Sequence, residues 1–144
     1  MGHRNDGLSH FELVDAMRQW VEAEVQAGRV VALIGRKGTG KTTLAKASAP
    51  NALHIDLSTC APGWGDALRD NSRPVILDEV SNKPRTTLNA DVVMEQNDGI
   101  NGLICLFEVE SEMRAYLGDS VRPFTAFYLD PGSYRRQSWG ETEQ

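Results

Sequence analysis

The chain has 144 residues, a net charge of −5 and 40% hydrophobic residues, values typical of one ordinary globular domain. Its two cysteines, Cys60 and Cys105, lie far apart and outside any C-x-x-C spacing, which argues against a disulfide framework, a zinc site and a redox pair. No apolar run approaches the roughly 18 residues of a membrane span and the charge is acidic, so we expect a cytoplasmic protein with no general affinity for the nucleic-acid backbone.

The first predicted element is an amphipathic helix over residues 9–28. Ser9 and Glu12 form the S-x-x-E capping box of a helix N-terminus, and Gly28 is a stop signal for its C-terminus. Between them, apolar residues recur at helical spacing: Leu13, Val14, Met17, Trp20, Val21 and Val25. The polar side of this helix is acidic, which favours packing on a protein core over lying on a membrane surface.

From residue 29 onward, apolar runs of strand length alternate with helical stretches. The expected strands cover 30–34, 52–57, 74–77, 103–107 and 124–129, and the expected helices begin at Lys41 or cover 64–68, 86–96 and 111–117. This alternation predicts βαβ units, and therefore a parallel sheet with helices on both faces. We expect a single domain over 1–130, made of the N-terminal helix and a core over 29–130.

The expected strands differ in their hydrophobic pattern, which indicates where each lies in the sheet. The runs 30–34, 75–77 and 103–107 are continuously apolar, as strands buried on both faces must be, so we expect them at the centre. The strand 52–57 alternates apolar and polar residues, which is typical of an edge. His54 belongs to its polar face, and we expect it to be solvated and to have no special role.

Residues 131–144 are mostly polar and include Tyr134, Arg135, Arg136 and Trp139. We predict a loose C-terminal tail here. The alternative is an arm that binds a neighbouring subunit.

A phosphate-binding motif follows the first core strand directly. Residues 35–42 have the sequence GRKGTGKT, which matches G-x-x-x-x-G-K-[ST] in the strand-to-helix context that the motif requires. Gly35, Gly38 and Gly40 allow the main chain to come close to phosphate oxygens, so that successive N–H groups, including that of Thr39, converge on a β-phosphate. The motif therefore predicts binding of a nucleoside triphosphate, with ATP as the expected nucleotide.

The side chains at the end of the motif have distinct expected roles. Lys41 places its ammonium between the β- and γ-phosphates, and the Thr42 hydroxyl coordinates Mg²⁺. The next residue, Thr43, is expected to contact the α-phosphate. The N-terminus of the helix that begins at Lys41 adds its positive end to the site.

Two adjacent carboxylates, Asp78 and Glu79, follow the third expected strand. Open α/β sheets bind their ligands at the carboxyl ends of parallel strands, so these side chains belong to the same edge as the loop. We expect Asp78 to hold Mg²⁺ through water and Glu79 to act as the general base that activates the attacking water.

These residues resemble P-loop ATPases of the additional-strand, catalytic-glutamate class, and within it the AAA-type ATPases. Residues 38–42 are similar to the AAA-type loop (Walker A), and 75–79 to its Walker B strand. The resemblance covers about 30–129 and implies a three-layer α/β/α P-loop NTPase fold, with a five-stranded parallel sheet in the order 5-1-4-3-2. This order agrees with the central and edge strands inferred from burial.

The resemblance also implies a polar sensor residue after the fourth strand and a helical lid after the fifth. Glu108 is unusual as a sensor, so Ser111 is the catalytic candidate at this position. Too few residues follow the fifth strand for a lid, which implies a homo-oligomer whose neighbouring subunit supplies an arginine finger. The candidates are Arg114, Arg122, Arg135 and Arg136, with Arg85 as a weaker one.

Three functions remain open at this point. The first is an oligomeric, AAA-like ATPase that works as a motor or switch. The second is a small-molecule or nucleotide kinase, although 110–123 is short for an arginine-rich lid and an acceptor site. The third is an assembly or regulatory module that binds ATP and hydrolyses it slowly or not at all.

Overall fold

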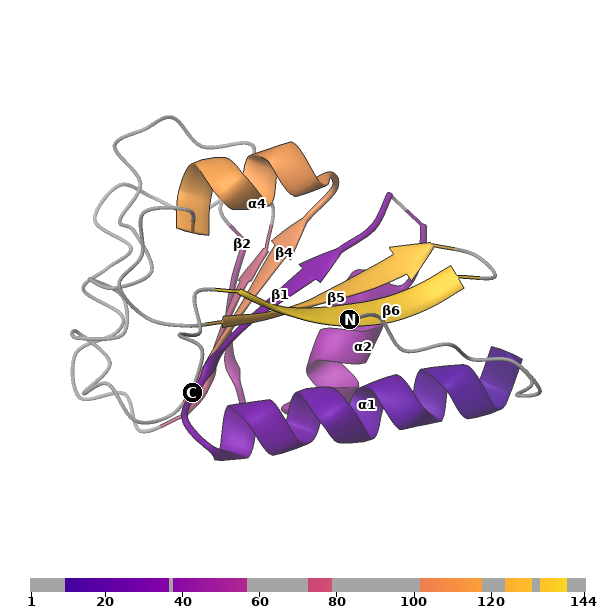
Figure 1. Cartoon of the computed structure of the whole chain (residues 1–144). Helices are drawn as coiled ribbons and strands as arrows, with labels where there is room; N and C mark the ends of the chain where they lie inside the picture. The colour runs from indigo at the N-terminus through magenta and orange to yellow at the C-terminus, as the bar shows by residue number, and fades with distance from the viewer. Residues whose placement is uncertain are drawn as a thin grey trace, which may run out of the picture.

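The computed structural model of the protein describes residues 10–36, 38–56, 73–78, 102–117, 124–130 and 133–139. These residues form three layers, with helices on both sides of one sheet (Figure 1). In chain order the elements are α1 (His10–Gln26), β1 (Val30–Ile34), α2 (Lys41–Ser48), β2 (Leu53–Asp56), β3 (Val75–Asp78), β4 (Leu103–Phe107), α4 (Glu110–Leu117), β5 (Phe124–Asp130) and β6 (Ser133–Trp139).

The sheet has the order β2-β3-β4-β1-β5-β6. All neighbouring pairs from β2 to β5 are parallel, which confirms the predicted five-stranded parallel sheet and its order 5-1-4-3-2. As predicted, the continuously apolar strands β1, β3 and β4 lie inside the sheet, and the alternating strand β2 lies at its edge. Because the strands are parallel, the carboxyl ends of β1 to β5 meet at one edge.

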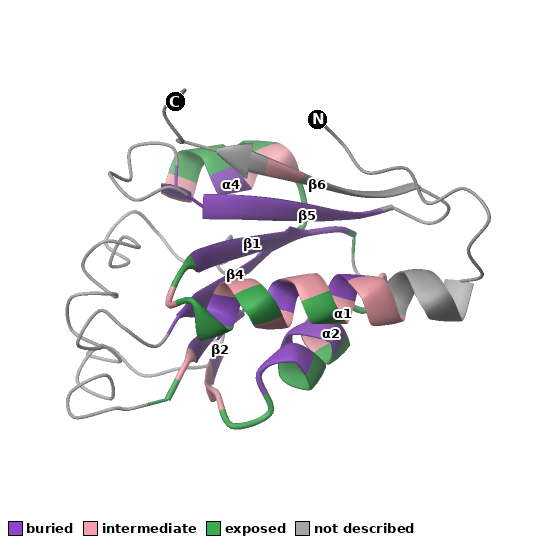
Figure 2. Cartoon of the chain, turned by 60° about the horizontal axis from the view of Figure 1, so that its bottom comes forward, coloured by how far each residue is buried: buried purple, intermediate pink, exposed green. Residues whose placement is uncertain are grey.

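The two faces of the sheet are covered by different helices. Figure 1 shows α1 and α2 on one side and α4 on the other. Met17 and Leu44 from the first pair pack with Val31 and Leu33 of β1, while Met113 of α4 belongs to the opposite cluster. Every residue of β1, β3 and β4 is buried, as Figure 2 shows for β1 and β4. This two-sided burial explains why their sequences are continuously apolar.

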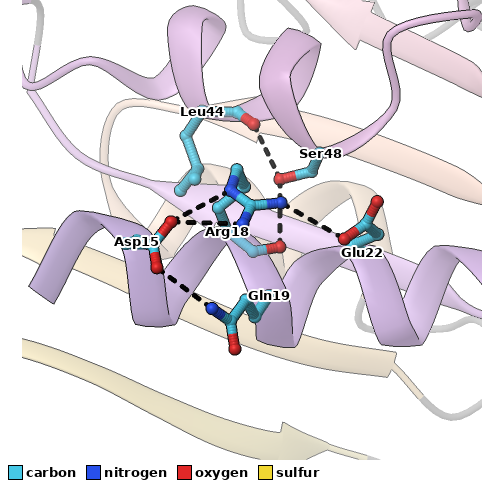
Figure 3. A network of polar contacts seen from close by, with 6 residues as sticks. All are labelled: Asp15, Arg18, Gln19, Glu22, Leu44 and Ser48. Atoms are coloured by element: carbon cyan, nitrogen blue, oxygen red, sulfur yellow. Dashed lines mark hydrogen bonds and ion pairs between the residues drawn. The ribbon is translucent and has the colours of Figure 1, made fainter. Parts of the chain in front are cut away.

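Helix α2 is oriented by its packing on α1. Met17 and Val21 of α1 are buried in the same cluster as Leu44. At this contact, the Ser48 hydroxyl donates to the carbonyl oxygen of Leu44 at 2.8 Å, and the carbonyl oxygen of Arg18 lies 3.5 Å from the same hydroxyl. Figure 3 draws both contacts. The salt bridges of Arg18 within α1 are partly exposed and worth little, so apolar packing supplies most of the stability here. The contact fixes the helix that begins directly after the glycine-rich loop.

Strand β6 corrects the prediction of a loose tail over 131–144. Ser133–Trp139 pairs antiparallel with β5, from Asp130↔Ser133 to Phe124↔Trp139. The strand contains no apolar run, so its hydrophobic pattern does not reveal it, and its pairing with β5 uses backbone hydrogen bonds. The missed signal is the Pro131-Gly132 dipeptide between the paired residues, a sequence that marks a turn.

Two expected helices, over 64–68 and 86–96, lie outside the described residues, as does the capping residue Ser9. Within the described part of the chain, no helix is both long enough and apolar enough to span a membrane.

Candidate functional site

The glycine-rich loop lies between β1 and α2, at the edge where the parallel strands end. Gly35 anchors its start, because its N–H donates to the carbonyl oxygen of Phe107 in β4 at 3.1 Å. A Cβ atom at Gly35 would lie 2.5 Å from the Thr39 hydroxyl and 3.1 Å from the carbonyl oxygen of Leu129. Any larger residue would therefore push the loop away from the strand ends that position it.

Two glycines and Thr39 shape the rest of the loop before α2. Gly38 and Gly40 have φ angles of +89° and +91°, a left-handed conformation that favours glycine. Thr39 tightens the turn, since its hydroxyl and its N–H both donate to the carbonyl oxygen of Arg36, at 2.7 and 3.1 Å. The Thr39 N–H is thus paired within the loop, which differs from the expectation that it faces a β-phosphate. Gly40 is the N-cap of α2, and no side chain caps this end. The first N–H groups of α2 lack intrahelical acceptors and are available to an anion.

Lys41 adds a positive charge above the loop. Its ammonium donates to the carbonyl oxygen of Gly35 at 2.5 Å and to that of Arg36 at 3.4 Å, so the side chain folds back over the loop. The first turn of α2 contains no acidic residue that would neutralise this charge. Lys41 and the helix N-terminus thus concentrate positive charge at one point, which suits a phosphate group.

Thr42 and Asp78 join the loop to the third strand. The Thr42 hydroxyl donates to Asp78 Oδ2 at 3.2 Å, although 36 residues separate the two in the chain. Asp78 ends β3 and is almost fully buried, with 8% of its surface exposed. The structure therefore brings Thr42 and Asp78 together, as the sequence predicts.

The oxygen atoms of this pair fit Mg²⁺. Magnesium prefers hard oxygen ligands, and proteins usually hold it with one or two carboxylates together with substrate phosphates and water. Among the described residues there is no group of three or more His, Cys, Asp or Glu side chains that would form an all-protein metal site. A hydroxyl and one carboxylate beside a phosphate loop are the donors expected for a metal that arrives with a nucleotide.

His54 is a site residue that the sequence reading missed. Its Nε2 atom lies 3.0 Å from Asp78 Oδ2, and its side chain is 29% exposed, so the prediction of a fully solvated histidine is wrong. The register pairs His54 with Ile76, two residues before Asp78, and this places both polar side chains on the same face of neighbouring strands. The predicted strand order places these two strands side by side and so indicates that His54 lies near the end of β3. The register that brings His54 to Asp78 could not be predicted from the sequence.

The predicted sensor residues lie at the start of α4, on the face of the sheet opposite α2. Ser111 is exposed in the first turn, and Glu108 is exposed just before it. The side chain of Glu112 accepts a hydrogen bond from the N–H of Glu108 at 3.2 Å, which stabilises the entry to the helix. The sensor role of Ser111 therefore stays a prediction.

The other predicted residues differ in how far the structure describes them. Thr43 is exposed in the first turn of α2. Arg114 forms an ion pair with Glu110 of its own helix at 2.7 Å, and Arg135 and Arg136 lie within β6, where the register pairs them with Tyr128 and Phe127. The proposed base Glu79, together with Arg85 and Arg122, lies outside the described residues.

Comparisons with known proteins identify the fold. No family model matches the sequence, and no curated protein matches it. The crystal structure of NtrX from Brucella abortus in complex with ATP aligns with a TM-score of 0.52 and 17% identity over 80% of this chain. The aligned region is 35% of the NtrX chain, so our chain corresponds to about a third of that protein. The flagellar accessory protein FlaH from Methanocaldococcus jannaschii aligns with a TM-score of 0.45 and 12% identity, over 86% of this chain and 82% of its own.

At 17% identity, the likeness to NtrX shows the fold alone. Together with the strand order, it shows that the chain has the P-loop NTPase fold.

Proposed function

We propose that this protein is a P-loop ATPase that binds ATP and hydrolyses it with Mg²⁺. The observation that carries the proposal is the 3.2 Å contact between Thr42 and Asp78, which brings the end of the phosphate loop to the end of β3. ATP as the nucleotide is supported by NtrX, a protein of the same fold whose crystal structure is a complex with ATP.

The proposed binding mode uses the main chain of the loop first. N–H groups of the loop and of the first turn of α2 donate to the β-phosphate, and Thr43 contacts the α-phosphate. The ammonium of Lys41 exchanges the carbonyl oxygens of Gly35 and Arg36 for oxygens of the β- and γ-phosphates. Because those carbonyls already hold Lys41 above the loop, little rearrangement of the side chain is needed.

The proposed chemistry depends on further residues at the end of β3 and in the first turn of α4. Thr42 and Asp78 would hold the magnesium ion, which neutralises charge that develops on the phosphates. Glu79 follows Asp78 directly in the chain, and its carboxylate would accept a proton from the attacking water. Ser111 would orient that water from the first turn of α4. These roles correspond to the additional-strand, catalytic-glutamate class and to an AAA-type core.

We further propose that the active form is a homo-oligomer in which a neighbouring subunit supplies an arginine. An arginine placed in trans stabilises the charge of the transition state in many P-loop enzymes. The candidates are Arg122, Arg135 and Arg136, together with Arg114, which would have to leave its ion pair with Glu110.

Phosphate release tests this proposal. We expect inorganic phosphate to form from ATP in Mg²⁺ but not in excess EDTA, and the rate per subunit to rise with protein concentration because assembly completes the site. A constant rate per subunit, together with a monomer at every concentration, would contradict the oligomeric site. Phosphate transfer only to an added acceptor would identify a kinase, and saturable ATP binding without phosphate release would identify an assembly module.

A further inference from the structure

We propose that His54 is a positioning residue that holds the carboxylate of Asp78 in the orientation needed for the metal ion of the bound nucleotide. The inference rests on the proposed function, because it assigns a role within the same Mg²⁺–ATP site. It concerns the edge strand β2, for which the sequence alone predicts no functional residue.

The contacts of a single oxygen atom carry the inference. Asp78 Oδ2 receives the Thr42 hydroxyl at 3.2 Å and lies 3.0 Å from His54 Nε2. The two groups come from different elements, α2 and β2, and both elements contact β3. Two hydrogen bonds to one oxygen from separate directions restrict rotation of the carboxylate about its Cβ–Cγ bond.

The chemistry of the pair fixes the direction of the hydrogen bond. A carboxylate has no hydrogen to donate, so the hydrogen lies on Nε2 of His54 and Asp78 accepts it. The side chain of Asp78 is 12% exposed, and a buried carboxylate needs donors to replace the water that it has lost. Hydrogen bonds to metal-binding carboxylates orient them, and removing such a partner typically lowers metal affinity or activity roughly 10- to 100-fold.

The diagonal distance between positions 54 and 78 calls for a long side chain, and histidine provides one. His54 is paired with Ile76, so it reaches Asp78 diagonally along the strand direction. Neighbouring strands lie about 4.8 Å apart and rise about 3.3 Å per residue, so a residue two positions further along the neighbouring strand is about 8 Å away, and a long side chain is needed to span this gap. Glutamine can place its amide nitrogen near the position of Nε2, whereas asparagine is one carbon shorter. Both amides carry an N–H donor, but they differ in length. Comparing His54→Gln with His54→Asn therefore tests whether the donor must reach the position of Nε2.

The experiment measures ATP affinity with Mg²⁺ and with EDTA for the wild type, His54→Gln, His54→Asn and His54→Ala. We expect His54→Ala and His54→Asn to weaken binding roughly 10- to 100-fold in Mg²⁺ and to leave binding in EDTA unchanged. His54→Gln is expected to keep most of the Mg²⁺-dependent affinity. Thermal unfolding of each variant shows whether it is folded. If His54→Ala is not folded, the comparison of His54→Gln with His54→Asn decides the result.

Three outcomes would overturn the inference. Wild-type affinity in Mg²⁺ for both His54→Ala and His54→Asn would show that Asp78 needs no partner on β2. An equal loss in Mg²⁺ and in EDTA would show a purely structural role, as would an equal loss for His54→Gln and His54→Asn. A wild-type protein that binds no ATP in either condition would instead remove the proposed function, and the inference with it.

Discussion

Replacing Glu79 by glutamine is expected to preserve ATP binding while lowering hydrolysis by roughly a hundredfold or more. Glutamine keeps the size and hydrogen-bonding capacity of the side chain but cannot accept a proton from water. The phosphates are bound by the loop, by Lys41 and by the Thr42–Asp78 pair, none of which this substitution changes. Nucleotide titration and phosphate release on the same preparation measure the two effects separately.

Asp78→Asn is the matched comparison for this variant. It changes the neighbouring residue to the corresponding amide, but Asp78 acts through the metal, so we expect affinity and Mg²⁺ dependence to fall together. If ATP drives assembly, the Glu79→Gln protein should remain assembled in ATP. A Glu79→Gln protein with full hydrolysis would show that Glu79 is not the base, and would favour a kinase, in which this carboxylate need not activate water.

Lys41→Ala is expected to abolish measurable ATP binding while leaving the fold intact. The ammonium lies above the loop, held by the carbonyl oxygens of Gly35 and Arg36, and the side chain does not enter the core. Charge-assisted hydrogen bonds contribute about 1.5–3 kcal/mol each, so losing two of them to phosphate corresponds to a reduction in affinity of roughly a hundredfold or more. Titration with a fluorescent ATP analogue measures the loss.

Lys46→Ala is the control for this experiment. Lys46 lies in the last turn of the same helix and is exposed, so its removal changes the net charge equally without touching the loop. Wild-type affinity is expected for Lys46→Ala, and a wild-type unfolding temperature for both variants. Unchanged affinity in the Lys41→Ala protein would remove the assignment of the phosphate loop.

The features that the sequence predicted correctly depend on local patterns. The bounds of β1 and β4 match the predicted ranges 30–34 and 103–107, because a strand buried on both faces must be apolar at every position. Helix α2 begins at Lys41 as predicted, since the glycine-rich motif defines its own strand-to-helix context. The meeting of Thr42 with Asp78 was also predictable, because parallel strands place their carboxyl ends at one edge.

The features that could not be predicted from the sequence depend on pairing between distant segments. Strand β6 is stabilised by hydrogen bonds to the edge of β5, and its polar residues resemble those of a tail when read alone. The contact of His54 with Asp78 depends on the register of β2 against β3, and a shift of one residue would turn His54 to the other face. Hydrophobic periodicity does not show which segment pairs with an edge strand, or in which register two strands pair.

The most direct measurement of the central claim is a titration of the wild-type protein with labelled ATP in Mg²⁺, with ADP and AMP as competitors. We predict saturable binding at one site per chain. ADP should displace the label and AMP should not, because the loop binds the β-phosphate, which AMP lacks. The absence of saturable binding, or displacement by AMP as effective as that by ADP, would contradict the assignment of a nucleotide-binding phosphate loop.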